Sequence, residues 1–192
     1  MFRSDLFSQE KHGFLSYGNE TVQGQQLMGQ AHFNGTKITG PSSFLGDVSA
    51  ENNTEFDAVQ ITGKFKVSDK ALIKKDFLAT GQINTKGATF ESSLTATGDV
   101  RMQNTTINGE INLISGKVEL SDSLVKKSIS FNDDGRGLPP KLILKNTVIH
   151  GDVTFKGSNG IVEMDKASRI EGSLVGAKIA DQAEAASVGP KL

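Results

Sequence analysis

Pairs of apolar or small residues, with one residue between the two members, return about every six positions along most of this chain. The clearest run contains Phe65/Val67, Ala71/Ile73, Phe77/Ala79, Ile83/Thr85, Ala88/Phe90, Leu94/Ala96 and Val100/Met102. Alternation within each pair is typical of a short β-strand with one buried face. The next pair follows too soon for an antiparallel hairpin and its turn. The chain is therefore expected to wind into a coil that always keeps the same face inward.

Glycines recur with the spacing that three such faces require. Gly29, Gly46, Gly63, Gly81 and Gly98 are separated by 17, 17, 18 and 17 residues. Glycine suits a corner because it adopts positive φ without a Cβ clash. The pattern predicts an all-β fold, a single-stranded, three-sided β-solenoid with about 17–18 residues per coil and roughly eight coils. Gly109, 11 residues after Gly98, falls two faces later and is expected at a different corner.

The repeat divides the chain into three parts. Residues 1–24 do not follow it and are expected to form an N-terminal cap or a flexible arm. Residues 25–175 form the predicted solenoid domain, with a corner insertion at 132–140 where polar residues, glycines and two prolines interrupt the pairs. Residues 176–192 are small, polar and rich in alanine, which indicates a flexible C-terminal tail or a short capping helix.

Composition narrows the choice of partners. Lys and Arg number 21 against 22 Asp and Glu, so the chain lacks the basic excess of a nucleic-acid-binding protein. It contains no cysteine, which excludes disulfides and thiolate metal sites. Neither a signal peptide nor a membrane span is evident, and a cytoplasmic protein is expected. Phe2, Leu6 and Phe7 offer an alternative contact with a membrane surface, which Asp5 and Glu10 oppose.

No motif predicts a catalytic, cofactor or metal site, and the protein is not expected to be an enzyme. His12, His32 and His150 are tied to no serine or acid by a known motif. The stretch at 133–137, Asp-Asp-Gly-Arg-Gly, lacks the spaced oxygen ligands of a calcium loop and the following helix of a phosphate loop. Thr62, Thr80 and Thr97 form an outward column that resembles the threonine columns of ice-binding solenoids. Those solenoids need a second threonine on each strand, but here the second outward position holds Gln60, Leu78 and Thr95. The high strand propensity of threonine therefore explains the column.

Gly-Asp-Val corners at 46–48, 98–100 and 151–153, together with the repeat around them, resemble the bactofilin family. The resemblance covers residues 25–130 well and 141–175 loosely, and the insertion at 132–140 departs from the family pattern. It implies a right-handed, three-sided β-helix and a bacterial cytoskeletal protein that polymerises without nucleotide.

The ends of a solenoid expose unpaired backbone groups on every side, so they are either capped or covered by another subunit. For stacked ends, the predicted contacts are Ala31 and Phe33 in the first coil and Ile170 and Leu174 in the last. The first functional hypothesis is therefore a non-enzymatic scaffold that associates with itself end to end, as a homo-oligomer or filament.

The alternative hypothesis is a capped solenoid that binds or processes a glycan on a lateral face. Such a site needs a groove lined by carboxylates or aromatic rings. One Tyr and no Trp in the whole chain supply little surface for sugar stacking. The composition therefore favours the scaffold.

Overall fold

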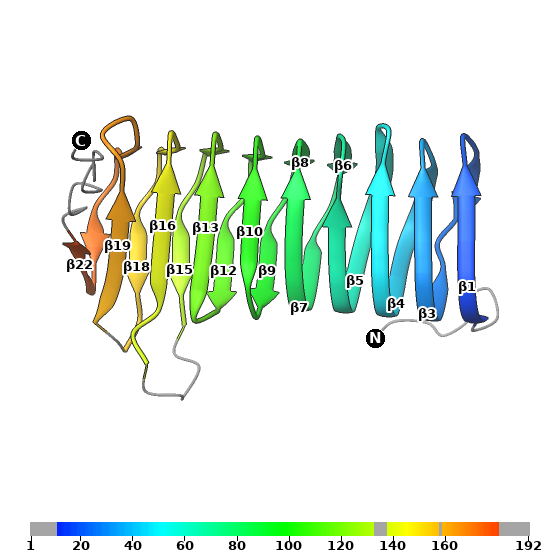
Figure 1. The fold of residues 1–192 in the computed structure, drawn as a ribbon, viewed down its shortest axis with the longest axis horizontal. Helices are drawn as coiled ribbons and strands as arrows, with labels where there is room; N and C mark the ends of the chain where they lie inside the picture. Colours follow the sequence, from blue (N-terminus) through cyan, green and yellow to red (C-terminus); the bar gives the residue numbers. More distant parts are fainter. Residues whose placement is uncertain (1–10, 133–137, 158, 181–192) are drawn as a thin grey trace, which may run out of the picture.

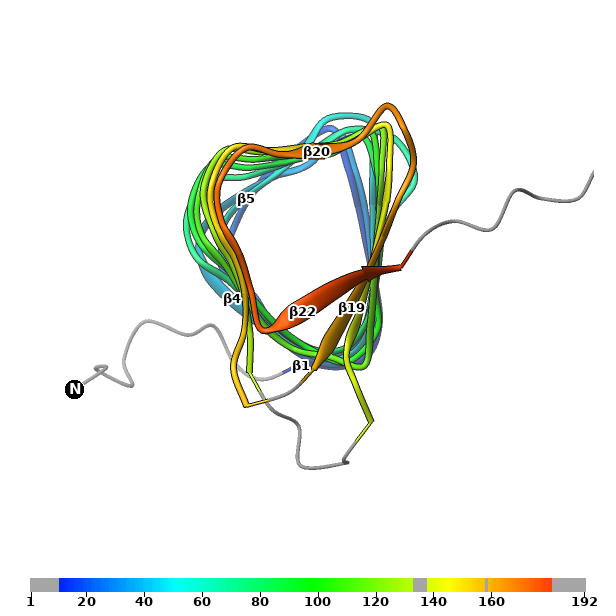
Figure 2. The same ribbon diagram turned by 90° about the vertical axis from the view of Figure 1, so that its left-hand side faces the viewer.

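The computed structural model of the chain describes residues 11–132, 138–157 and 159–180. Within these ranges every regular element is a β-strand, and the strands pair in parallel into one sheet that winds around a single core. The result is a rod of about 10 turns (Figure 1) with a three-sided cross-section (Figure 2). The chain ascends the front of Figure 1, descends behind it and advances to the left, so the coil is right-handed. The predicted fold class is confirmed.

Each turn contributes one segment to each of three faces, called here faces I, II and III in the order in which β4 crosses them. Five strands in the first half bend around corners and span two or three faces: β1 (Lys11–Gly18), β3 (Gln26–Asn34), β4 (Lys37–Glu51), β5 (Thr54–Val67) and β7 (Phe77–Lys86). Face I also contains β2 (Thr21–Gln23), β6 (Ala71–Ile73), β8 (Ala88–Phe90), β11 (Thr106–Ile107), β14 (Leu124–Val125), β17 (Val148–Ile149) and β20 (Arg169–Ile170). Face II continues with β9 (Leu94–Thr97), β12 (Ile111–Ile114), β15 (Ile129–Phe131), β18 (Val153–Phe155) and β21 (Leu174–Val175). Face III continues with β10 (Val100–Gln103), β13 (Lys117–Ser121), β16 (Lys141–Lys145), β19 (Gly160–Met164) and β22 (Ala177–Ala180).

The inward pairs stack in register from turn to turn and fill the core. On face III, Phe65 pairs with Val48 on one side and with Ile83 on the other. The predicted inward positions of the regular repeat are almost all buried. A staircase of rings runs through the first half, with centroids 5.0–6.1 Å apart along Tyr17, Phe33, Phe56, Phe65, Phe77 and Phe90. Stacking of neighbouring turns therefore supplies the buried apolar surface that one turn alone lacks.

The corner between faces II and III is the predicted glycine column. Its five glycines have φ between 118° and 142°, a region open to glycine at little cost. Gly109 lies at a different corner, as expected, the one between faces I and II. An added Cβ there would meet Ser92 of the preceding turn. The corner between faces III and I was not predicted. It is a second column of positive φ, built mainly from Asn19, Gly35, Asn52, Lys70, Gly87, Asn104, Asp122 and Asn146.

The solenoid is longer at both ends than the sequence pattern predicts. Strand β1 pairs with β3 and β2 pairs with β4, so residues 11–23 belong to a turn of the coil and not to a cap or a flexible arm. At the other end, β22 pairs with β19, so residues 177–180 form a strand and not a tail or helix. The rod therefore has about 10 turns instead of eight. Residues 1–10, 133–137 and 181–192 of the predicted cap, insertion and tail lie outside the described residues.

Candidate assembly surfaces

The N-terminal end of the core carries a polar group of side chains. Lys11 pairs with Leu27 and so stands at an inward position of face II. Its Nζ donates to Tyr17 Oη and to Gln25 Oε1, both at 3.0 Å, and Tyr17 Oη donates to Gln25 Oε1 at 3.2 Å. Gln25 Nε2 donates in turn to the carbonyl oxygen of Gln23. These polar groups satisfy one another, and they place a positive charge over this end of the core.

Ala31 and Phe33 are therefore not end contacts, and that prediction is wrong. They lie in the second turn, where Leu15 and Tyr17 of β1 stack on them. Both are buried, and the Phe33 ring stacks on Tyr17 with centroids 5.8 Å apart. Substitution at either position would disturb the core and not a contact between copies.

The C-terminal end has an apolar edge. Ile170 and Leu174 lie in the last described turn, as predicted, and both are half-buried. Among the described strands, β20, β21 and β22 each pair only with the preceding turn. Ile179 follows Val162 in the inward column, yet 57 % of its surface is exposed. The inward pair Ala177/Ile179 continues the sequence repeat by one further turn, and this signal identifies the last described turn.

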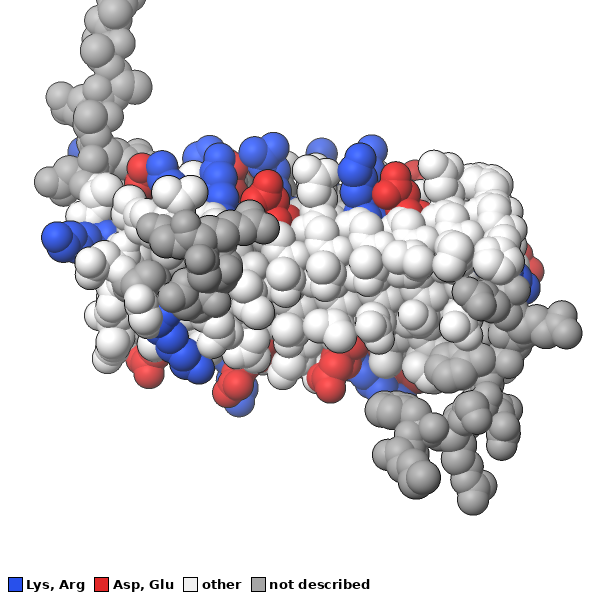
Figure 3. All heavy atoms as spheres, turned by 90° about the horizontal axis from the view of Figure 1, so that it is seen from below, with Lys and Arg blue, Asp and Glu red and all other residues white. Residues whose placement is uncertain are grey.

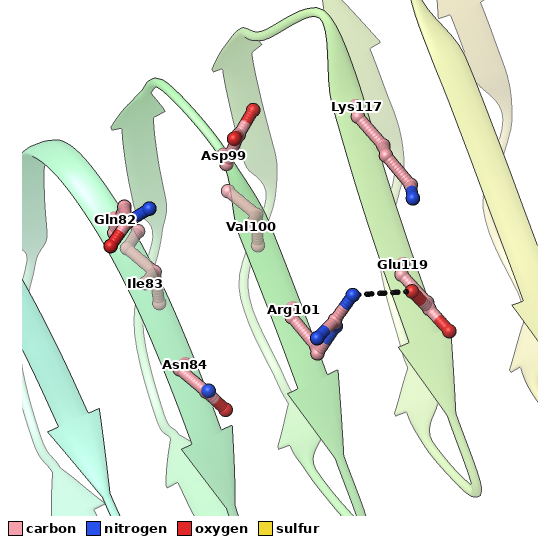
Figure 4. A pocket seen from close by; sticks show the side chains of 8 residues that line it. All are labelled: Gln82, Ile83, Asn84, Asp99, Val100, Arg101, Lys117 and Glu119. Atoms are coloured by element: carbon pink, nitrogen blue, oxygen red, sulfur yellow. Dashed lines mark ion pairs between the residues drawn. The ribbon is translucent and has the colours of Figure 1, made fainter.

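Face III carries charged side chains and a shallow hollow of about 240 Å³ (Figure 4). Arg101 and Lys117 line it together with the carboxylates of Asp99 and Glu119. Glu119 accepts from Lys145 Nζ at 2.7 Å and lies 3.3 Å from Arg101 Nη2. The hydrogen bond from Lys145, with the positive charges of Lys145 and Arg101, lowers the pKa of Glu119. Glu119 therefore stays ionised near neutral pH and is a poor proton donor.

A second polar group on face III joins three residues that sequence analysis did not connect. His32 Nδ1 lies 2.9 Å from Ser49 Oγ, and His32 Nε2 lies 3.4 Å from Glu51 Oε1. The separation of 17 residues between His32 and Ser49 is one turn of the coil, which is the signal that would have found the contact. The order acid, histidine and serine is that of a hydrolytic triad. However, β3 and β4 are each paired on both sides, so their amides are engaged in the ladder and do not form an oxyanion hole.

Face II differs from face III in having no charged outward column. Its outward positions hold Ser, Thr, Asn, Gln and scattered large apolar residues, including Leu45, Leu78 and Ile114. Over the middle of the rod, Figure 3 shows this surface as a band without Lys, Arg, Asp or Glu, bordered by charged rims. The predicted threonine column of Thr62, Thr80 and Thr97 runs along its middle.

The described residues contain no group of three or more His, Asp or Glu placed to hold a metal ion. They also include no helix of the length and apolarity that a membrane span requires. Comparison of the chain with protein-family models, with curated proteins and with solved structures gives no match. The ends and the lateral faces of the rod are therefore the features that bear on function.

Proposed function

We propose that the protein is a non-enzymatic scaffold that associates with copies of itself through the C-terminal end of the solenoid. The observation that carries the proposal is the apolar edge of the last described turn. Ile179 and Leu174 there occupy inward positions, no described strand follows this turn, and the edges of β20, β21 and β22 offer backbone groups for pairing. Covering this edge would bury apolar surface, which is the main driving force for association of this kind. It would also extend the backbone hydrogen-bond ladder.

The chemistry of the two ends favours one arrangement. Stacking the C-terminal end on the N-terminal end of another copy would place Ile179 against the hydrogen-bonded side chains of Lys11, Tyr17 and Gln25. That contact would bury the Lys11 ammonium group without a charged partner, which is costly. Two C-terminal ends match one another, since a two-fold contact places the same apolar patch on both sides. The first product is therefore a dimer of rods. Longer assemblies, in the manner of bactofilins, need a second contact and no nucleotide.

The experiment that tests the proposal is Ile179→Asp, measured by size-exclusion chromatography with light scattering and by negative-stain electron microscopy. The variant is expected to lose the C-terminal contact, because two carboxylates would face each other across it. Phe14→Asp is the matched control: Phe14 is 66 % exposed on face III of the first turn, and the change in charge is the same. Circular dichroism should show the same strand content in both variants. Association that survives Ile179→Asp unchanged would contradict the proposal.

The alternative, a glycan site on a lateral face, has one supporting observation, the carboxylates in the hollow of face III. Both Asp99 and Glu119 line it, but the lining includes no aromatic ring. Calorimetric titration with neutral and acidic oligosaccharides separates the two functions. Binding that disappears in Asp99→Asn or Glu119→Gln would support the glycan site, and a bactofilin-like scaffold in a bacterial cytoplasm predicts none.

A further inference from the structure

Two outward columns run along most of face II without a charged residue. Parallel register connects each member to the next turn, so the first column is continuous over nine turns and the uncharged part of the second extends from the first turn to the eighth. The first column is Gln26, Ser43, Gln60, Leu78, Thr95, Asn112, Ser130, Thr154 and Val175. The second is His12, Met28, Leu45, Thr62, Thr80, Thr97 and Ile114. Backbone hydrogen bonds to the preceding turn continue it with Asn132 and then with Lys156, where the neutral surface ends.

Exposed apolar side chains gather on this face. Eight large hydrophobic residues are exposed among the described residues, and five of them belong to the two columns: Met28, Leu45, Leu78, Ile114 and Val175. The side chains between them are mostly hydroxyls and amides, which both donate and accept hydrogen bonds. A surface of this composition resembles the core of a protein interface, where charged residues are depleted.

We infer that face II binds the same face of a second copy of this chain, with the two rods antiparallel. The partner must itself be uncharged, because a polyanion or a charged protein surface would find no opposite charge here. About eight uncharged turns at a spacing of about 4.8 Å, and a width of about 15 Å, give roughly 600 Å² on each copy. The two copies together would bury about 1,200 Å², which reaches the size of a specific interface.

The positions of the apolar side chains match under a two-fold axis. Leu45 lies two turns before Thr80, and Ile114 lies two turns after it. Leu78 shares a strand with Thr80. A two-fold axis that lies in the plane of the contact above this strand, and parallel to it, reverses the rod and keeps each column opposite itself. It therefore places Leu78 against Leu78 and Leu45 against Ile114 twice, as an isologous contact requires.

This lateral contact is independent of the C-terminal contact, so it is tested in the Ile179→Asp background, where lateral pairs are the expected dimer. Leu78→Lys would bring two ammonium groups together at the axis and is expected to weaken the dimer by about a hundredfold, measured by analytical ultracentrifugation. Ile143→Lys is the matched control, because Ile143 is an outward residue of face III between Glu119 and Glu163. Equal weakening by both variants would overturn the inference.

Charge pairing tests the register. Leu45→Lys alone and Ile114→Glu alone are each expected to weaken the dimer, since each introduces a charge into a neutral face. The two substitutions in one chain should restore much of the affinity, because each new ammonium group then faces a new carboxylate of the other copy. Additive losses in the double variant would exclude the proposed register.

Single cysteines give a direct measurement, since the chain contains none. With a short bis-maleimide, Leu78→Cys should cross-link to itself, whereas Leu45→Cys should do so only in chains that also carry Ile114→Cys. In the proposed dimer, the two copies of position 45 are about four turns, or roughly 19 Å, apart along the rod. No cross-link at Leu78→Cys above the level of Ile143→Cys would overturn the inference and leave face II to a different neutral partner. Loss of the C-terminal contact would not affect this result.

Discussion

The corner between faces II and III is built in two ways in the two halves of the rod. From Gly29 to Gly81, one glycine bends a continuous strand, and β3, β4, β5 and β7 each pass through the corner. After Gly98 the strands before and after the same corner are separate, with residues 115–116, 132–140 and 156–159 between them, until Gly176 alone joins β21 and β22. The difference is visible along the lower edge of Figure 1 as tight bends in the first half and longer connections toward the C-terminal end.

Contact between successive glycines explains the uniformity of the first half. A Cβ on Gly63 would lie 2.1 Å from the carbonyl oxygen of Gly46, and a Cβ on Gly81 would lie 2.0 Å from that of Gly63. Each glycine therefore requires a bare Cα in the next turn. A Cβ on Gly116 would meet nothing within 4 Å. The comparison shows that stacked strands keep the coil regular even where a corner is free to vary.

The sharpest way to break this comparison is the same substitution in the two halves. Gly63→Ala should destabilise the protein by about 3 kcal/mol or more, because positive φ and overlap with a backbone oxygen add together. Gly116→Ala should change the stability by no more than about 1 kcal/mol. Urea denaturation followed by circular dichroism measures both. Similar midpoints for the two variants would show that the glycine contacts do not control the corner.

The glycine column, the inward pairs and the fold were predictable because each depends on a period that the sequence displays directly. The corner between faces III and I escaped prediction because it repeats a backbone conformation and not a residue type. Asn and Asp tolerate positive φ, as glycine does, so Asn52, Asn104 and Asp122 form one column although their residues vary. Aligning the chain on its turns would have shown them one above another.

The ends were harder to predict for a different physical reason. Lys11 and Tyr17 occupy inward positions but are stabilised by hydrogen bonds instead of apolar contacts, so the first turn does not show the apolar pattern. Missing that turn placed Ala31 and Phe33 at the end. Ile170 and Leu174 were placed correctly because the later turns keep apolar inward pairs. The neutral columns of face II were visible in the sequence only once the outward residues were set in register.

A substitution of intermediate effect tests how the corner between faces II and III is packed in the second half. A Cβ on Gly160 would lie 2.2 Å from the Phe155 ring, which stacks on Phe131 with centroids 4.2 Å apart. A ring can shift where a backbone oxygen cannot, so Gly160→Ala should cost about 1–3 kcal/mol, less than Gly63→Ala. In a protein that already carries Phe155→Ala, which removes the ring, Gly160→Ala should be nearly neutral. Additive losses would show that the ring does not cause the effect.

The second half also connects its turns with ion pairs on face III. Glu119 in β13 contacts Arg101 of the preceding turn and Lys145 of the following one, and Lys141 pairs with Glu163 at 2.7 Å. Among the described residues of this face, the ion pairs made by Lys or Arg all lie in that half. These contacts therefore span the turns where the glycine column has ended.

The smallest expected effect concerns the pH dependence of this connection. The pKa of Glu119 is lowered from 4.5 in the folded protein, mainly by the hydrogen bond from Lys145. The stabilisation by ionised Glu119 is therefore fully present above the pKa of the unfolded state, and it is lost as the pH falls through the lowered pKa of the folded state. Glu119→Gln should reduce the stability at pH 7 by less than about 1 kcal/mol, because the pair is partly exposed. The curves of wild type and variant should converge in urea denaturation as the pH falls below the lowered pKa of Glu119. Glu110→Gln controls for net charge, and a constant difference between the curves at all pH values would show that the carboxylate charge is not what connects these turns.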